Sequence, residues 1–324
     1  MIPQTFAAIT DAFTGILSIP VIGGIIPKLT GSDMNPVLVL FVMLLLFFMF
    51  VLAMNAPPLI VWGIRRLFSE KPTFQRCWSY LDLWLVPQVI LYLFIVLLLP
   101  LMLLAGPNAK SAEGMMANVG FILPMLFIQN VVFFGVPAAF IRWKYQLPLR
   151  EIGFGPLPTR RDVLMGVGLG LAAIAISMPL EYGLKAAAEH FKHVPFIAWG
   201  LKIEQNLPIN ALIDAVTKKG IGVLILAAIA IGPGPGFGEE MLFRGFLFGL
   251  LRRRLGLWPG IVISGFVFAA IHGYFIGFLP VFLLGMALAF LYNKTGSLWT
   301  GIIVHATNNS VLVLLAYFFP ALSK

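Results

Sequence analysis

Charge is scarce in this sequence. Of its 324 residues only 11% are Asp, Glu, Lys or Arg, whereas 60% are hydrophobic, and the mean hydropathy is +0.97. A soluble domain carries roughly a quarter charged residues, so this composition excludes an ordinary soluble protein. Apolar runs of about 18 residues or more recur instead, which is typical of membrane-spanning helices. The weak alternation of an outer-membrane barrel is not seen.

Several catalytic patterns are also missing. Cys77 is the single cysteine, so no intramolecular disulfide or cysteine-rich metal site can form, and no neighbouring histidine suggests a thiol protease. No HExxH motif of a zinc protease occurs. Ser264, in VISGF, shares its span with a histidine two turns away, which is only a weak serine-protease pattern. An aspartyl intramembrane protease is excluded because all five aspartates lie in loops or at span ends: Asp11, Asp33, Asp82, Asp162 and Asp214.

The apolar runs predict an all-α, polytopic transmembrane bundle of about eight spans. The spans cover residues 37–62, 83–105, 119–141, 163–183, 221–251, 258–274, 277–293 and 297–319. Apolar residues between 6 and 17 recur at helical spacing, which predicts a short interfacial helix. We therefore divide the chain into residues 1–220, with this helix, four spans and a long outer loop near 184–220, and residues 221–324, a motif-bearing core.

The net charge of +9 has a simple explanation in this class of protein. Basic clusters at 65–76, 142–161 and 252–254 would all face the same side of the membrane, and such clusters favour the cytoplasmic side. An even number of spans then places both termini outside. We expect a multi-pass protein of the inner or plasma membrane, with the lipid bilayer as its surroundings. Nucleic acid is not an expected partner, since no basic patch with interleaved aromatics occurs.

The four predicted spans before residue 220 have no ionisable residue near their centres. Gln129 and Asn130 are expected to bond across a helix interface or to line a cavity, and Gly166 and Gly170 form a GxxxG pattern expected to pack closely against another helix. The stretch EHFKH at 189–193 carries two histidines that could bind a metal. A solvated or interfacial helix explains that stretch better, because no further ligand is evident.

The stretch GFGEEMLFRG, residues 236–245, places three charges inside an apolar span. Each charge in hydrocarbon costs on the order of 2.5–3.5 kcal/mol, so a use or a partner is expected. Glu240 and Arg244 are four residues apart and share a helix face, so they can pair. Glu239 then lies about 100° around the helix without that partner, and it is available as a general base.

The preceding stretch IGPGPGFG, residues 231–238, contains two prolines and four glycines. Such a sequence is not expected to continue a regular helix. Irregular backbone at membrane depth is tolerated where it is buried in protein or lines a wet cavity. We therefore expect the glutamates to begin a fresh helical segment at the edge of a polar cavity, with a simple packing kink as the alternative.

Two later spans bring further polar groups to the same depth. His272 ends FVFAAIH, and His305 and Asn309 lie one helical turn apart in HATNN. At about 1.5 Å per residue, Glu239 and both histidines fall in the middle of a core about 30 Å thick, so they can meet. Packing alone, a two-histidine, one-carboxylate zinc site and a transporter relay are alternatives, although no inverted repeat supports the last.

Three motifs stand in order on these spans: EExxxR at 239–244, FxxxH at 268–272 and HxxxN at 305–309. Together they resemble the CaaX-protease and bacteriocin-processing family of intramembrane proteases, which includes the Ras-converting endopeptidases. The resemblance covers roughly residues 221–319. It implies an endopeptidase that acts on a membrane-associated or lipid-modified protein or peptide, and a prenylated CaaX protein is one substrate class that it implies.

The resemblance also implies a role for each polar residue. Glu239 would activate the attacking water, and His272 would help to hold that water. His305 and Asn309 would bind the oxyanion of the tetrahedral intermediate. These roles suit the groups, because peptide hydrolysis needs a base near water and donors aimed at developing negative charge.

Glu240 and Arg244 would support the site by pairing and by orienting their helix. The resemblance implies glutamate-dependent chemistry without a metal cofactor, and zinc held by Glu239, His272 and His305 is the other interpretation. The alternative function is that of a non-catalytic family member, an immunity or scaffold protein of the membrane.

Overall fold

The computed structural model describes residues 78, 80–104, 119–205, 207, 212–213 and 220–319. The chain divides into two compact units, Met1–Pro72 and Thr73–Lys324, and all the described residues belong to the second. The predicted interfacial helix, the predicted span 37–62 and Cys77 lie outside the described residues. No β-strand occurs within the ranges described.

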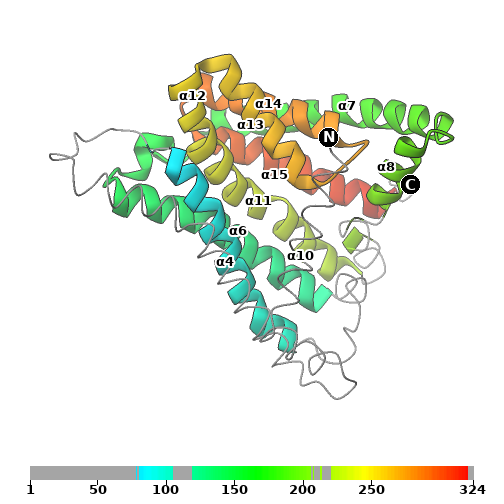
Figure 1. Ribbon diagram of the computed structural model, residues 1–324, viewed down its shortest axis with the longest axis horizontal. Helices are drawn as coiled ribbons and strands as arrows, with labels where there is room; N and C mark the ends of the chain where they lie inside the picture. The colour runs from blue at the N-terminus through cyan, green and yellow to red at the C-terminus, as the bar shows by residue number, and fades with distance from the viewer. Residues whose placement is uncertain are drawn as a thin grey trace, which may run out of the picture. The chain divides into compact units, whose positions relative to one another are not determined.

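The described helical elements are coloured in chain order in Figure 1. They are α4 (Tyr80–Leu104), α6 (Val119–Ala139), the π-helix η2 (Phe140–Lys144), the 3-10 helix η3 (Leu149–Ile152), α7 (Arg160–His190), α8 (Pro195–Gln205), α10 (Ile221–Ile231), α11 (Pro233–Glu239), the π-helix η4 (Glu240–Phe248), α12 (Gly249–Leu255), α13 (Leu257–His272), α14 (Phe278–Thr295) and α15 (Leu298–Phe318).

Six described segments are long and apolar enough to cross a membrane. They are Leu81–Leu98, Gly120–Lys144, Arg160–His190, Ile221–Leu255, Phe278–Thr295 and Leu298–Phe318. Helix α13 is also apolar but shorter, with 16 residues. Each predicted span within the described ranges coincides with one of these helices. The predicted fold class, a helical membrane bundle, is therefore confirmed.

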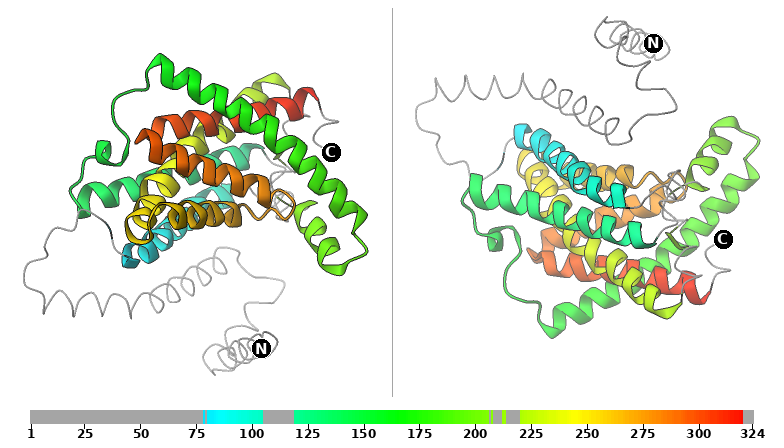
Figure 2. Two further views of the ribbon diagram at one scale, coloured as in Figure 1. Left: turned by 90° about the horizontal axis from the view of Figure 1, so that it is seen from above. Right: turned by 90° about the horizontal axis from the view of Figure 1, so that it is seen from below.

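The GxxxG pattern lies at the contact between α7 and α15, which cross in Figure 2. A Cβ atom on Gly166 would come within 2.6 Å of Ile303, and one on Gly170 within 2.7 Å of Thr307. These glycines therefore let the two backbones approach, as predicted. The packing positions α15, the helix that carries His305 and Asn309, against α7.

The predicted break before the glutamates occurs at a single residue, Gly232, where α10 ends. The stretch after it is helical, which corrects the expectation that the glutamates begin the fresh segment. Helix α11 begins at Pro233, Glu239 is its last residue, and Glu240 opens the π-helix η4. Proline is well tolerated at the first position of a helix because its missing N–H would have no helical partner there. The second proline, Pro235, lies within the same first turn.

The glycines of α11 serve helix packing. A Cβ on Gly234 would lie 2.6 Å from the Asn130 amide of α6, and one on Gly236 would lie 2.9 Å from the Ile302 carbonyl oxygen of α15. Helix α11 is thus wedged between α6 and α15, with Glu239 at its end. Asn130 does lie in a helix interface, but its buried Oδ1 has no hydrogen-bond partner.

The π-helix η4 is enclosed on the side of α4. The Trp78 indole Nε1 donates to the Phe246 carbonyl oxygen at 2.8 Å, and the two rings stack with centroids 5.4 Å apart. A π-helix is wider than an α-helix and is frequent at functional sites. The chain before residue 220 therefore packs directly on the segment that carries Glu240 and Arg244.

The segment predicted as a long outer loop is partly helical, which is a second correction. Helix α7 continues to His190, and α8 follows after a short turn. The extension contains Lys185, Glu189 and His190, so hydropathy alone ended the helix too early. Glu189 pairs with Lys192 at 3.5 Å on the surface, as expected for a solvated helix. In the described part of the chain no group of three His, Cys, Asp or Glu residues is arranged to hold a metal.

Candidate active site

Glu239, the last residue of α11, lies where three helices converge. Its side chain is only 8% exposed, and its Oε2 atom lies 3.8 Å from the Nε2 atom of His272 and 3.8 Å from the Nε2 atom of His305. That oxygen is buried without a hydrogen-bond partner. The predicted meeting of α11, α13 and α15 through these three side chains is therefore observed.

Glu240 has a different environment although it is the next residue. Its side chain is fully buried, and its Oε1 atom lies 2.9 Å from Arg244 Nη1 and 3.2 Å from His305 Nδ1. Gly301 on α15 leaves the space for this carboxylate, because a Cβ there would lie 2.7 Å from Glu240 Oε2. The predicted pairing of Glu240 with Arg244 is observed, and the pair also contacts His305.

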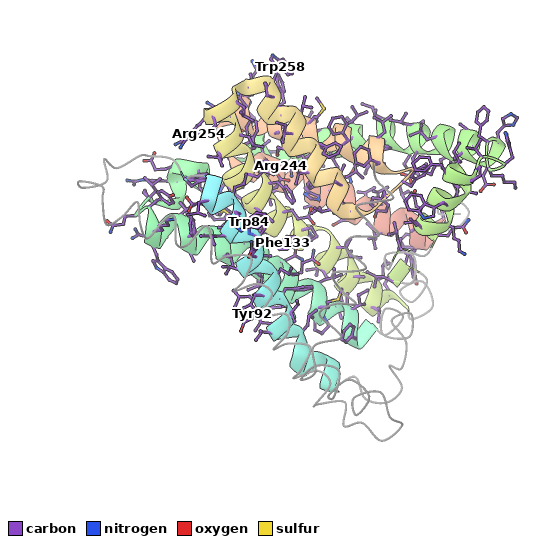
Figure 3. All side chains as sticks on the ribbon, viewed as in Figure 1. Trp84, Tyr92, Phe133, Arg244, Arg254 and Trp258 are labelled. Atoms are coloured by element: carbon purple, nitrogen blue, oxygen red, sulfur yellow. The ribbon has the colours of Figure 1, made fainter. Side chains whose placement is uncertain are left out.

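Arg244, which Figure 3 labels, is fully buried and contacts side chains or backbone of three elements. Besides its pairing with Glu240, its Nη2 donates to the Gly285 carbonyl oxygen of α14 at 3.2 Å. Its guanidinium carbon lies 4.4 Å from the ring centroid of Phe268 on α13. A planar guanidinium suits this combination of carboxylate, carbonyl and aromatic face, which a lysine would match poorly.

His272 shows why the FxxxH spacing matters. Its Nδ1 atom lies 2.6 Å from the carbonyl oxygen of Phe268, one turn earlier on α13, and the two rings are 4.7 Å apart. A carbonyl oxygen can only accept, so Nδ1 carries the hydrogen. In the neutral ring Nε2 then presents a lone pair toward Glu239.

The ring of His305 is oriented in the same way as that of His272, with Nδ1 facing a hydrogen-bond acceptor, but the acceptor is different. Its Nδ1 atom faces the Glu240 carboxylate, which also pairs with Arg244. Nδ1 therefore donates, and Nε2 of a neutral His305 also presents a lone pair. As a result, two imidazole Nε2 atoms and a carboxylate oxygen converge on one point, where they can accept protons or, if an imidazole is protonated, donate one.

Tyr274 lies beside His272, just after α13. Its ring stacks on the imidazole with centroids 6.0 Å apart. Burial, together with the carboxylates of Glu181, Glu204 and Glu239, raises the pKa of Tyr274 to about 12. The phenol therefore stays protonated at neutral pH and is not a base. The His272 side chain is 24% exposed, so the cluster is most accessible on this side.

Asn309 lies one turn after His305 on α15 and is hydrogen-bonded to the end of α10. Its Nδ2 donates to the carbonyl oxygen of Ile231 at 3.1 Å, where α10 ends, and its Oδ1 accepts from Asn308 at 3.1 Å. Ser310 donates to the Ala228 carbonyl oxygen beside it. These contacts hold the break at Gly232. One amide hydrogen of Asn309 is thus used outside the Glu239 cluster.

Several residues of the site were not identified from the sequence. Asn308, Ser310 and Gly301 have no recognisable pattern, since their importance comes from contacts with α10 and η4. Ser264, the weak serine candidate, is buried and its Oγ atom has no hydrogen-bond partner. Neither ring nitrogen of His272 serves it, because Nδ1 bonds Phe268 and Nε2 faces Glu239.

Comparison with known proteins supports the family resemblance. The family model for type II CAAX prenyl endopeptidases of the Rce1-like group matches residues 221–311, the part of the chain that contains the three motifs. The protein named "Putative membrane peptidase YdiL" of Bacillus subtilis (strain 168) is 27% identical over 106 residues. That alignment spans 33% of this chain and 41% of the relative, so the chain covers less than half of its length. No solved structure gives a match.

Proposed function

Because residues 221–311 match the model of the Rce1-like family, we propose that this chain is an intramembrane endopeptidase. Its reaction is the hydrolysis of a peptide bond in a membrane-associated or lipid-modified protein or peptide. One observation supports the proposal most directly. The unpartnered Oε2 atom of Glu239 lies 3.8 Å from the Nε2 atoms of both His272 and His305, a spacing that a water molecule bridges.

The charges of the cluster suggest which residue acts as the base and which donates hydrogen bonds. Glu239, Glu240 and Arg244 together carry one excess negative charge, and burying a net charge is costly. One additional proton on His305 removes the excess. His305 then donates from Nδ1 to Glu240 and from Nε2 into the site, and the Glu239 carboxylate remains ionised as the base.

The reaction follows from this arrangement. Glu239 takes one proton from the water as the water oxygen attacks the substrate carbonyl carbon. The second water hydrogen stays on that oxygen and donates a hydrogen bond to Nε2 of His272. The Nε2–H of protonated His305 stabilises the oxyanion. Glu239 then returns its proton to the leaving amine as the C–N bond breaks. The second amide hydrogen of Asn309 is the further donor that the family resemblance assigns to the oxyanion.

Glu240 and Arg244 act by positioning. Their buried pair fixes the hydrogen on His305 Nδ1, so that the protonated ring directs Nε2–H into the site. The contact of Arg244 with Gly285 and Phe268 ties this pair to α13 and α14. Such support is common for groups that orient a reactive histidine.

Zinc is the alternative chemistry for the same side chains. Two imidazole nitrogens and a carboxylate are a ligand set that catalytic zinc accepts. Glu239, His272 and His305 would hold the ion, although among the described residues no three such side chains have the spacing of a metal site. We propose a reaction that does not need metal, and a strong chelator tests it.

The proposal is tested with purified full-length protein in detergent and a library of hydrophobic and prenylated peptides. New termini are identified by mass spectrometry for the wild type, for Glu239→Ala and for Glu189→Ala, which changes an exposed glutamate of α7. We expect cleavage by the wild type and Glu189→Ala, without loss in chelator, and none by Glu239→Ala. Cleavage that is lost in chelator and restored by zinc would show that the reaction needs zinc, which contradicts the proposed metal-free reaction.

The same experiment distinguishes a peptidase from the alternative, a non-catalytic immunity or scaffold protein. If the peptides remain intact with all three proteins while one peptide binds the wild type tightly, the chain is a non-catalytic family member that acts by contact. Prenylated and unprenylated forms of each peptide should be compared, because the substrate class implied by the family is prenylated. A preference for the prenylated form would identify the lipid as part of the recognition.

A further inference from the structure

Helix α8 has three faces of different chemistry. At roughly 100° per residue, Phe196, Trp199 and Ile203 align along one face. Their exposed fractions are 63%, 56% and 37%. This apolar stripe, defined by those three residues, would be unfavourable in water. Ala198 and Lys202 lie on a separate exposed face of the same helix.

The third face of α8 is packed against the loop that follows His272. A Cβ atom on Gly200 would lie 2.3 Å from the Phe275 ring, so the helix backbone rests on that ring. The Glu204 carboxylate accepts hydrogen bonds from the backbone N–H groups of Phe275, Ile276 and Gly277. These groups stand at the start of α14, where a carboxylate is favoured by unsatisfied N–H groups.

The length of α7 indicates where α8 lies with respect to a bilayer. Helix α7 has 31 residues, which corresponds to about 46 Å, whereas the hydrocarbon core is about 30 Å thick. Arg160, Arg161 and Asp162 begin α7, and Lys185, Glu189 and His190 lie near its end, so turns at both ends are expected to extend past the core. Helix α8 turns back from the His190 end toward the bundle, as Figure 2 shows, so its stripe is brought to the level of the lipid headgroups.

We propose that α8 is an interfacial membrane-binding helix whose stripe, Phe196, Trp199 and Ile203, inserts into the headgroup region of the lipid bilayer. Tryptophan and phenylalanine on an amphipathic helix are typical of that layer. Phe191 and Val194, just before α8, are also exposed apolar residues, and six described segments of the same chain are able to cross a membrane, which is the reason to assign lipid rather than a protein as the partner of the stripe.

Membrane binding by α8 also fixes the depth of the site. The bonds of Glu204 and the contact of Gly200 join α8 to the loop at 273–277. That loop begins one residue after His272. The bilayer surface thus sets the height of the accessible side of the cluster, and hence which bonds of a membrane-bound chain reach it.

The proposal is tested by site-directed spin labelling of the full chain in phosphatidylcholine–phosphatidylglycerol vesicles. Because the chain has a single cysteine, Cys77→Ser provides a background for single-cysteine variants. Labels are placed at Trp199→Cys and Phe196→Cys in the stripe, and at Ala198→Cys as the matched control on the neighbouring face. Power saturation then measures collision of each label with oxygen and with a water-soluble nickel chelate.

We expect the ratio of oxygen to nickel accessibility to be higher at positions 196 and 199 than at 198, because oxygen concentrates in lipid. Equal ratios at the three positions would mean that the stripe faces water and would overturn the proposal. Low accessibility to both reagents at 196 and 199, with an immobilised spectrum, would mean that protein covers the stripe, which also overturns it. Neither result depends on peptidase activity.

Discussion

At the residue scale, Arg244 is the side chain whose loss the bundle should tolerate least. It is fully buried, pairs with Glu240 and contacts α13 and α14. Removing one partner of a buried ion pair leaves the other charge uncompensated, which costs about 3–5 kcal/mol. The cost therefore comes from the stranded Glu240 rather than from the attraction that is lost.

Arg244→Met is expected to lower the thermal unfolding midpoint in detergent strongly, while Arg150→Met, which changes an exposed arginine, leaves it nearly unchanged. Adding Glu240→Gln to Arg244→Met should recover part of the loss, because the stranded charge is removed. If the double variant is less stable than Arg244→Met alone, charge burial is not the cause.

At the element scale, Gly166 and Gly170 of α7 face α15 at close range, whereas Gly168 on the same helix has open space around it. A Cβ on Gly170 would lie 2.7 Å from Thr307 and 2.9 Å from the Val304 carbonyl oxygen, whereas a Cβ on Gly168 would meet nothing within 4 Å. Glycine is otherwise unfavourable inside a helix by roughly 0.5–1 kcal/mol relative to alanine.

The two alanine substitutions should therefore have opposite signs. Gly170→Ala forces α7 and α15 apart and is expected to destabilise the protein by about 1–3 kcal/mol. Gly168→Ala should stabilise it by roughly 0.5–1 kcal/mol. Equilibrium unfolding in mixed detergent measures both, and equal effects of the two changes would contradict the close contact.

The hydrogen bonds of Glu204 lead to a prediction about local unfolding at the start of α14. Glu204→Gln weakens the charge-assisted hydrogen bonds to Phe275, Ile276 and Gly277, so their backbone amides should exchange with deuterium faster. The matched control, Glu189→Gln, changes a glutamate paired on the surface and should leave these amides unchanged. Unaltered exchange in Glu204→Gln would show that α8 does not stabilise the start of α14.

The individual helices also show which features of the fold and the site could be predicted from the sequence. Hydropathy located every described span. Glu239 and His272 lie close together, as their estimated depths in the membrane predicted. The π-helix at 240–248 could not be predicted, because its wider turn depends on tertiary neighbours such as Trp78. The bonding of Asn309 to Ile231 likewise depends on where a different helix happens to end.

At the scale of the whole molecule, the orientation in the membrane remains a prediction. If both termini lie outside, the α12–α13 turn is cytoplasmic and α8 is outside, because α10 to α12 form one span between them. In the Cys77→Ser background, a membrane-impermeant thiol reagent on intact cells should label Ala198→Cys and not Arg254→Cys. The reverse pattern would place both termini inside.

The central claim is that Glu239 activates water between His272 and His305. The most direct measurement is the rate at which one identified peptide is cleaved by the wild type, Glu239→Gln and Glu189→Gln, with the unfolding midpoint recorded for each. We expect a loss on the order of 10²–10⁴-fold for Glu239→Gln, the usual contribution of a general base, at an unfolding midpoint no lower than that of the wild type. Cleavage by Glu239→Gln at the wild-type rate would contradict it.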